Sequence, residues 1–118
     1  IVPRLKGDLA ELLLAVAEGR MADVRPELSD EHSMTVVVAA EGYPGTPAKG
    51  GTIDGIEAAE RVPGVTVFHA GTARHGSGAL LGAGGRVLAV TALGPTLAEA
   101  RARVYQAVDA IDYSHGFH

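Results

Sequence analysis

The hydrophobic residues of the chain form two helical stripes and several runs that are typical of strands. The first stripe has apolar residues three and four positions apart, as on one face of an α-helix: Leu9, Leu12, Leu13 and Val16. Asp8 and Glu11 have the capping-box spacing of a helix N-terminus, and Gly19 stands where a left-handed C-terminal glycine is expected. The pattern predicts a helix of about three turns between Asp8 and Gly19.

The second stripe follows a predicted strand. Gly84 and Gly85 predict a tight turn with positive φ, and the small and β-branched residues of 86–93 predict a strand. Thr96 and Glu99 again have capping-box spacing. The apolar positions of the helix that they open are Leu97, Ala100, Val104, Val108 and Ile111. Because such a stripe needs a sheet face to bury against, we expect one packing unit with Arg86 at its open end.

Short strands and glycine-rich connections are predicted between the two stripes. Residues 34–40, with three consecutive valines, predict a strand that is covered on both faces. The Gly and Pro density of residues 41–52 excludes a helix and a central strand. The remaining predictions are a short strand and helical turn in 53–61, strands at 65–70 and 79–83, and a polar connection at 71–78 that makes this region a hairpin.

A linker is predicted early in the chain. Residues 20–30 are charged and contain Pro26, which favours a short helical turn followed by a connection. We therefore expect a domain boundary near Ser29, with residues 1–29 in one part and residues 30–118 in the other. Because the chain opens on Ile1 without an initiator methionine, we expect it to be the interior of something longer, with processing of the start as the alternative.

Composition narrows the class of protein. The 118 residues suit one modest domain, and 47% hydrophobic residues are ample for a core. No apolar run approaches the roughly 20 residues that span a bilayer, and no signal peptide opens the chain, so we expect a cytoplasmic protein with no membrane partner. A net charge of −4 without a basic run disfavours a nucleic-acid partner. The absence of cysteine excludes disulfides and thiolate metal sites.

The sequence shows no self-contained catalytic or metal site. The glycines of residues 76–82 differ in spacing and context from a dinucleotide-binding fingerprint, and no phosphate-binding loop motif is present. His115 and His118 lie one helical turn apart, but we favour a frayed tail over a metal site there. His69, near the end of a predicted strand, is either a general acid or base or a hydrogen-bonded structural residue. We therefore expect no catalytic and no metal-ligating residue.

Two features remain as candidate ligand sites. Beside the Gly84–Gly85 turn, Arg86 offers a planar fork for phosphate or carboxylate, and the turn amides offer further donors. The second feature is the loop around Tyr43, which also carries Lys49. The alternative is a hairpin with a surface arginine and an ordinary connecting loop.

Several blocks of the sequence resemble one family. The blocks are Pro3–Lys6 with Asp8–Leu9 and Glu11–Leu13, Glu41–Gly45 with Lys49–Gly50, Phe68–Thr72, and Gly84–Leu88 through Val90–Gly94 with Thr96–Leu97. In this order they resemble phosphoribosylamine–glycine ligase, also called glycinamide ribonucleotide synthetase. The resemblance covers nearly the whole chain.

This resemblance implies the C-terminal portion of an ATP-grasp ligase with an α+β fold. Residues 1–29 then form the last helix and linker of the ATP-grasp region. Residues 30–118 form a small antiparallel barrel-like sheet with a packed C-terminal helix, which closes the active-site cleft. The family joins glycine to 5-phosphoribosylamine through a glycyl phosphate made from ATP, with Mg²⁺ or Mn²⁺, and so makes glycinamide ribonucleotide in purine biosynthesis. The implied partners of this chain are the N-terminal and ATP-grasp domains.

Departures from the family limit the expected activity. The family's nucleotide-binding strands and its Glu and Asn metal ligands lie upstream of Ile1, so we expect this chain alone neither to bind ATP or metal nor to catalyse. Arg74 and His75 replace the lysine often found after the His-Ala-Gly-Thr block. In the intact ligase the expected substrate-binding residues are Arg86, Gly84, Gly85, Tyr43, Lys49 and His69. A structural or oligomerisation module without ligand contacts is the alternative.

Overall fold

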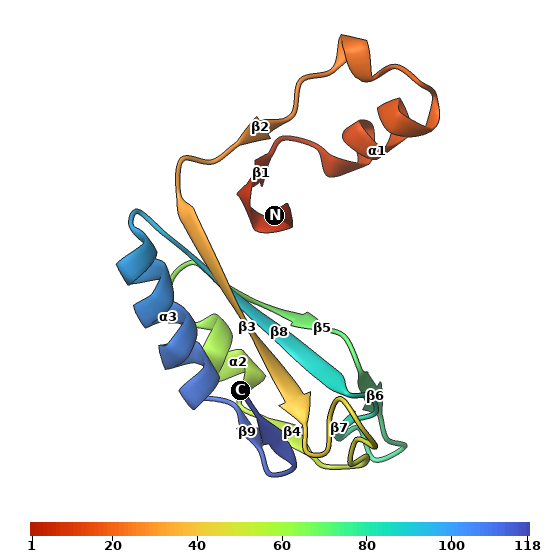
Figure 1. Ribbon diagram of the computed structural model, residues 1–118, viewed down its shortest axis with the longest axis vertical. Coiled ribbons are helices and arrows are strands. Elements are labelled where there is room, and N and C mark those ends of the chain that lie inside the picture. Colours follow the sequence, from red (N-terminus) through yellow and green to blue (C-terminus); the bar gives the residue numbers. More distant parts are fainter.

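The computed structural model describes all 118 residues, as an N-terminal segment (residues 1–31) and a larger sheet unit (residues 32–118) (Figure 1). The sheet unit is built on one four-stranded antiparallel sheet in the order β10-β3-β8-β5. Its strands are β10 (Gly116–Phe117), β3 (His32–Ala40), β8 (Arg86–Gly94) and β5 (Val65–His69). Val36, Val90 and Val67 face one another across three of these strands and mark the middle of the sheet.

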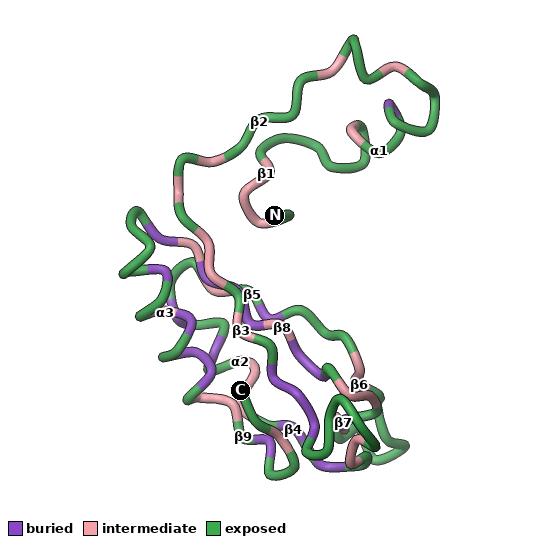
Figure 2. The backbone as a smooth tube through the Cα atoms, viewed as in Figure 1, coloured by how far each residue is buried: buried purple, intermediate pink, exposed green.

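Two helices cover one face of this sheet. Helix α3 (Leu97–Asp109) lies along β8 and β3, and α2 (Ile56–Glu60) lies between α3 and β5 (Figure 1). The Thr96 hydroxyl accepts a hydrogen bond from the Glu99 amide at 3.2 Å, so α3 begins at its predicted cap. The core forms between the helices and the sheet, and β8 is its most buried strand (Figure 2).

Three smaller antiparallel ladders complete the structure. Strand β4 (Ile53–Asp54) pairs with β9 (Asp112–Tyr113), and β6 (Thr72–Arg74) pairs with β7 (Leu80–Gly82). In the N-terminal segment, β1 (Leu5–Lys6) pairs with β2 (Glu27–Leu28). The α+β class and the antiparallel pairing are therefore confirmed. The ladders do not close into a barrel, because β10 and β5 are the two edges of the four-stranded sheet.

The N-terminal segment consists of one helix with short strands and turns on either side of it. Besides β1 and β2 it contains the turns η1 (Val2–Arg4) and η2 (Met21–Asp23) and the helix α1 (Leu9–Ala17). Asp8 Oδ1 accepts a hydrogen bond from the Ala10 amide at 2.8 Å, and Gly19 has a φ of 70°, as the caps predict. Among residues 1–31 only Ala15 is buried, so the predicted helix forms but its apolar stripe lies in solvent.

Strand β3 is less covered than its sequence predicts. Side chains alternate between the two faces of a strand, and α3 covers only the face that carries Val36. Val37 on the other face is 42% exposed, so the prediction that this strand is covered on both faces is wrong. The strand with near-complete burial is β8, whose Val87, Leu88 and Val90 have no exposed surface.

The glycine turn before β8 also differs from its prediction. Neither Gly84 nor Gly85 has a positive φ. A Cβ atom added at Gly85 would overlap the ring of Tyr43, and one added at Gly84 would lie 3.1 Å from the Gly71 Cα. These glycines are therefore explained by close approach of other segments rather than by a left-handed backbone.

Three further predictions need correction. The hairpin forms between β6 and β7, while β5 pairs with β8, because β8 offers β5 a long buried ladder. The C-terminal tail is not frayed, since Phe117 in β10 pairs with Ala39 in β3. Leu97 is 57% exposed, because α3 meets the sheet only from Ala100 onwards; Ala107 joins the buried stripe in its place.

Candidate substrate-binding site

A cavity of about 560 Å³ opens on the helix-free face of the four-stranded sheet, at the end where β8 begins. Three of the predicted site residues line it: Tyr43, Gly85 and Arg86. Its other lining residues are Val37, Ala70, Gly71, Leu88 and Ala89. Aspartate and glutamate are absent from this lining, so Arg86 faces no carboxylate there.

Backbone contacts hold the Tyr43 loop against the start of β8. The Ala40 amide donates to the Gly85 carbonyl at 2.8 Å, and the Tyr43 amide donates to the Ala40 carbonyl at 3.0 Å. Because Gly85 has no side chain, the Tyr43 ring can lie directly on its backbone. The ring therefore forms one wall of the cavity, and Arg86 stands beside it at the first position of β8.

The connection after β5 closes the other side of the cavity. The Gly71 amide donates to the Arg86 carbonyl at 2.9 Å, and the Ala83 amide donates to the Gly71 carbonyl at 2.7 Å. A Cβ atom at Gly71 would lie 2.7 Å from that Arg86 carbonyl, so only glycine permits this approach. Two segments distant in sequence thus meet where the candidate ligand would bind.

The site leaves hydrogen-bond donors free. The amides of Gly84 and Gly85 donate to no backbone or side-chain acceptor. The guanidinium of Arg86 is exposed and has no carboxylate partner, since both ion pairs of the chain are made by Arg20. A free guanidinium fork beside the free amide of Gly85 and an aromatic wall suits an anion such as phosphate, and the free amide of Gly84 precedes them in the chain.

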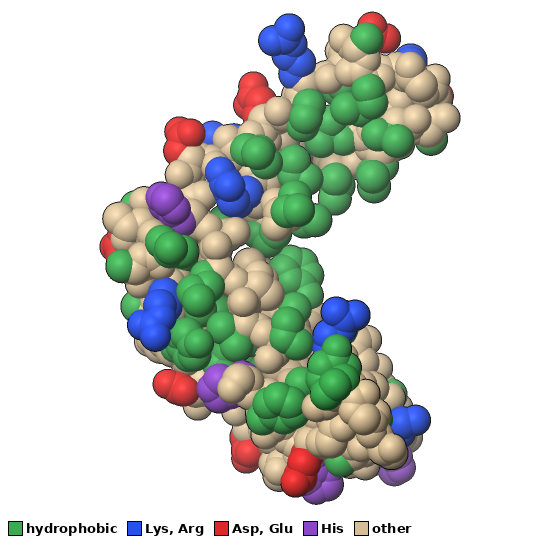
Figure 3. All heavy atoms as spheres, in the orientation of Figure 1, with side chains coloured by type: hydrophobic (Ala, Val, Ile, Leu, Met, Phe, Trp, Pro, Cys, Tyr) green, Lys and Arg blue, Asp and Glu red, His purple; other side chains and the backbone are tan.

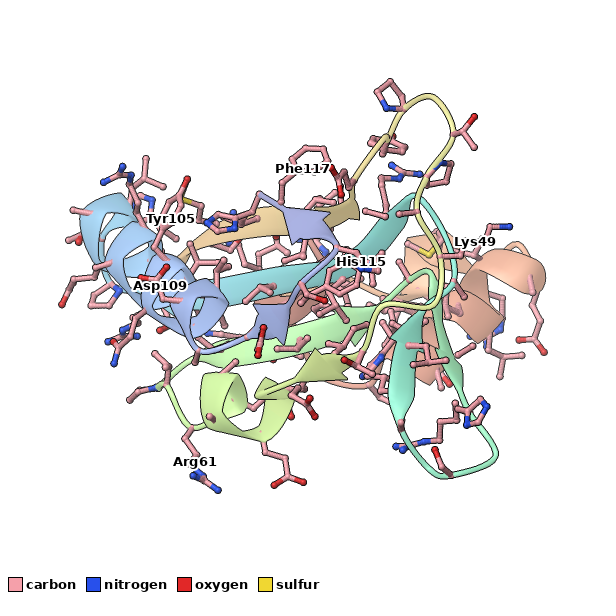
Figure 4. The ribbon with its side chains drawn as sticks, turned by 90° about the horizontal axis from the view of Figure 1, so that it is seen from below. Lys49, Arg61, Tyr105, Asp109, His115 and Phe117 are labelled. Atoms are coloured by element: carbon pink, nitrogen blue, oxygen red, sulfur yellow. The ribbon has the colours of Figure 1, made fainter.

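Three predicted site residues do not line this cavity: Gly84, Lys49 and His69. Lys49 is exposed on the loop between β3 and β4 (Figure 4). His69 lines a second cavity of about 560 Å³, and its Nδ1 is 3.1 Å from the Thr72 hydroxyl. That second cavity also holds Arg61 and Arg74, but Asp54 and Glu57 lie in its wall, so its charge is mixed.

Some lining residues were missed because only the sheet register brings them together. Val37 and Ala89 are paired across β3 and β8, and Ala70 follows the strand that pairs on the other side of β8. Gly71 carried a signal, since it stands inside the Phe68–Thr72 block. No cluster of three His, Cys, Asp or Glu side chains that could hold a metal ion is found, and no helix is long and apolar enough to cross a membrane.

Comparison with known proteins identifies the family. Residues 33–118 match the family described as phosphoribosylglycinamide synthetase, C domain. The chain belongs to this family. The resemblance expected from the sequence blocks is thereby confirmed.

Named relatives of the phosphoribosylglycinamide synthetase family agree along the whole chain. It is 52% identical over 117 residues to the phosphoribosylamine–glycine ligase of Mesorhizobium japonicum, covering 99% of this chain and 27% of that protein. It is 48% identical over 118 residues to the chloroplastic phosphoribosylamine–glycine ligase of Arabidopsis thaliana, covering 99% of this chain and 22% of that protein.

A solved structure extends the comparison to the fold. The crystal structure of phosphoribosylamine–glycine ligase from Thermotoga maritima superposes with a TM-score of 0.67 and 32% sequence identity. The match covers 89% of this chain and 25% of that chain. The chain therefore spans about a quarter of the length of the relatives that it matches.

Proposed function

We propose that this chain is the C-terminal part of a phosphoribosylamine–glycine ligase, which joins glycine to 5-phosphoribosylamine to give glycinamide ribonucleotide in purine biosynthesis in the cytoplasm. The observation that carries the proposal is the cavity in which Tyr43, Gly85 and Arg86 meet. The names of the relatives, at 48% and 52% identity along this chain, support the same reaction.

In this proposal Arg86 binds the 5-phosphate of phosphoribosylamine. Its guanidinium fork is free, and the unpaired amides of Gly84 and Gly85 add two donors. The phosphate lies away from the reacting amine, so these contacts hold the substrate without taking part in bond formation. Lys49 and His69, which lie outside the cavity, are left for substrate groups other than the phosphate.

ATP and the Mg²⁺ or Mn²⁺ ion are assigned to the rest of the ligase. No group of three potential metal-ligating side chains is found in this chain, so its residues do not fit the ion. We therefore propose no chemical step through the nucleotide or the metal in these residues. The role left to the chain is to close one side of the active-site cleft and to hold the substrate there.

The N-terminal segment is proposed to belong with the ATP-grasp region. The match to the C-domain family begins only at residue 33, close to the boundary expected near Ser29. The apolar stripe of α1 is exposed in this structure, with Leu13 61% accessible. In Figure 3, hydrophobic side chains gather on this segment beside the hollow that separates it from the sheet unit. We propose that the ATP-grasp domain covers this stripe in the full-length ligase.

Replacing Arg86 in the full-length ligase tests the substrate contact. Arg86→Ala is expected to raise the KM for phosphoribosylamine about 10- to 150-fold and to lower kcat much less, because a contact remote from the reacting amine is lost in ground state and transition state alike. Arg86→Lys should recover only part of the loss, since lysine keeps the charge but not the fork.

Arg101→Ala is the matched control for this experiment. Arg101 is an exposed arginine of α3 that lies near the Tyr105 ring, and it does not line the cavity. Arg101→Ala should leave the KM for phosphoribosylamine unchanged. If Arg86→Ala also leaves it unchanged in a folded enzyme, Arg86 is an ordinary surface residue and the structural-module alternative holds.

Titration of the 118-residue chain with Mg-ATP tests whether the nucleotide binds outside these residues. We expect no binding tighter than a dissociation constant of about 100 μM. Calorimetric binding below that value would place a nucleotide site in these residues and contradict the proposal.

A further inference from the structure

Tyr113, at the end of β9, is the central side chain of a contact that joins three segments. It is 8% exposed, and its ring lies against Gly51, Gly82 and Gly116. A Cβ atom at Gly51 would lie 2.8 Å from the ring Cε2, and one at Gly82 would lie 2.8 Å from Cζ and nearer still to the hydroxyl. At Gly116 it would overlap the opposite edge of the ring. None of these glycines has a positive φ, so each is needed for the approach of this ring.

Hydrogen bonds join two of these segments over the ring. The Gly50 amide donates to the Gly82 carbonyl at 2.8 Å, and the Gly82 amide donates to the Gly51 carbonyl at 2.8 Å. The turn after Tyr113 is tied to the end of β3, because the Glu41 amide donates to the His115 carbonyl at 2.7 Å. Figure 4 shows His115 beside the loop that carries Lys49.

The positions of these segments determine the position of the proposed phosphate site. Gly84 lies two residues after Gly82 and is followed by Gly85 and Arg86, and Gly51 lies two residues after Lys49. Glu41 opens the loop that places Tyr43 against Gly85. A shift of the Tyr113 ring would therefore move Gly82, and with it the segment that leads through Gly84 and Gly85 to Arg86.

The hydroxyl of Tyr113 takes no visible part in this contact. Its oxygen is buried without a hydrogen-bond partner. The ring therefore acts through its shape and packing, and loss of the oxygen alone should remove no interaction. This distinguishes a packing role from that of a hydrogen-bonding or acid–base residue.

We infer that Tyr113 is a positioning residue for the phosphate site, whose ring holds the segments 49–51 and 82–86 in the arrangement that Arg86 and its neighbouring amides require. The inference rests on the proposed function. The fold places Tyr113 outside the lining of the cavity, so it acts only through the backbone that it supports.

The test uses the 118-residue chain labelled with ¹⁵N and titrated with ribose 5-phosphate. The amide shifts of Gly84, Gly85 and Arg86 report binding, and hydrogen exchange at the Gly50 and Gly82 amides reports local order. Tyr113→Leu should weaken binding at least about tenfold and speed exchange at both amides, because the supporting ring is lost. Tyr113→Phe should change the affinity by less than about twofold, because only an unpaired oxygen is lost.

Val104→Ala is the matched core control. Val104 has no exposed surface and belongs to the same hydrophobic cluster, so its truncation also destabilises the fold, but it is not among the nearest contacts of Gly51, Gly82 or Gly116. Val104→Ala should leave the affinity unchanged, and it should not speed exchange at the Gly50 and Gly82 amides more than at other amides of the sheet. If Val104→Ala weakens binding as much as Tyr113→Leu, the role of Tyr113 is general stability and the inference is wrong.

Two further outcomes are informative. If Tyr113→Leu does not fold, Gly82→Ala replaces it, because the added methyl group would overlap the hydroxyl end of the Tyr113 ring and should produce the same two effects. Normal affinity and exchange in Gly82→Ala would overturn the inference. If ribose 5-phosphate shifts no amide of the wild-type chain, the proposed phosphate site fails, while the exchange rates still decide whether Tyr113 holds the two segments.

Discussion

The two long helices of this protein begin in the same way and end up in different environments. Helices α1 and α3 both start at a side chain that accepts a hydrogen bond from a backbone amide, namely that of Asp8 in α1 and that of Thr96 in α3. Both carry an apolar stripe. In α3 the stripe lies on β8 and β3 and is buried from Ala100 to Val108, whereas α1 contacts mainly η2 and buries only Ala15.

This difference separates helix formation from helix stability. The caps and the residue spacing act within one or two turns and are present in both helices. Burial needs a partner surface, which the sheet provides for α3 alone. A nine-residue helix without such a surface is marginal in water, so α1 should depend on whatever covers its leucines, and α3 should be as stable as the sheet unit.

Hydrogen exchange should show the largest difference between the two helices. Amides of α3 are expected to exchange only on global opening, and those of α1 through local fraying, so α1 should exchange at least about a thousandfold faster. NMR or mass-spectrometric exchange of the 118-residue chain measures both helices at once. Equal protection would show that the N-terminal segment and the sheet unit unfold together, which contradicts the boundary near Ser29.

A matched pair of leucine truncations should show the next largest difference. Leu88→Ala removes a side chain with no exposed surface from β8 and should lower the free energy of unfolding by about 2 to 5 kcal/mol. Leu13→Ala removes a largely exposed side chain from α1 and should change it by less than about 0.5 kcal/mol. Urea denaturation measures both values. A cost of more than about 2 kcal/mol for Leu13→Ala would reveal burial of α1 in solution.

Removing the two helix caps makes the same kind of local change in α1, which is exposed, and in α3, which packs on the sheet. Thr96→Ala should lower the free energy of unfolding by about 1 kcal/mol, because α3 unfolds with the sheet unit. Asp8→Ala should reduce the circular dichroism signal of α1 without moving the urea midpoint of the sheet unit. A midpoint shift of the same size in both variants would mean that the two helices are coupled.

Alkaline pH should weaken the sheet unit slightly through Tyr113. Burial of the phenol raises the pKa of Tyr113 above its ordinary value of 10.0, and the N-terminal segment contains no tyrosine. Below pH 10 this contribution to stability is complete. It is lost as the pH rises from 10 towards the raised pKa, because the unfolded chain then releases a proton that the folded chain keeps.

The variant Tyr113→Phe makes this effect measurable. It lacks the titrating phenol, so its free energy of unfolding should fall less between pH 9 and the raised pKa than that of the wild type. Thermal denaturation followed by circular dichroism at a series of pH values gives the comparison. Identical pH dependence in the two proteins would show that the phenol is not buried in solution.

Local signals in the sequence determined the elements of this protein. The caps at Asp8 and Thr96, the β-branched run of β8, and the Gly and Pro density of residues 41–52 act over a few residues, and each forms the structure predicted for it. The meeting of Tyr43, Gly85 and Arg86 at one cavity was partly foreseeable, because the sequence marked the turn and the loop as separate candidates.

Only the tertiary structure decided which surfaces are covered and why certain glycines are needed. Whether an apolar stripe is buried depends on a partner that is distant in the chain, so spacing could not separate α1 from α3 or show that β3 has an open face. Gly82 and Gly85 carry no left-handed backbone; they make room for tyrosine rings that are about 30 and 40 residues away in the sequence. Steric demands of this kind arise only when the chain has folded, because they belong to pairs of segments and not to either segment alone.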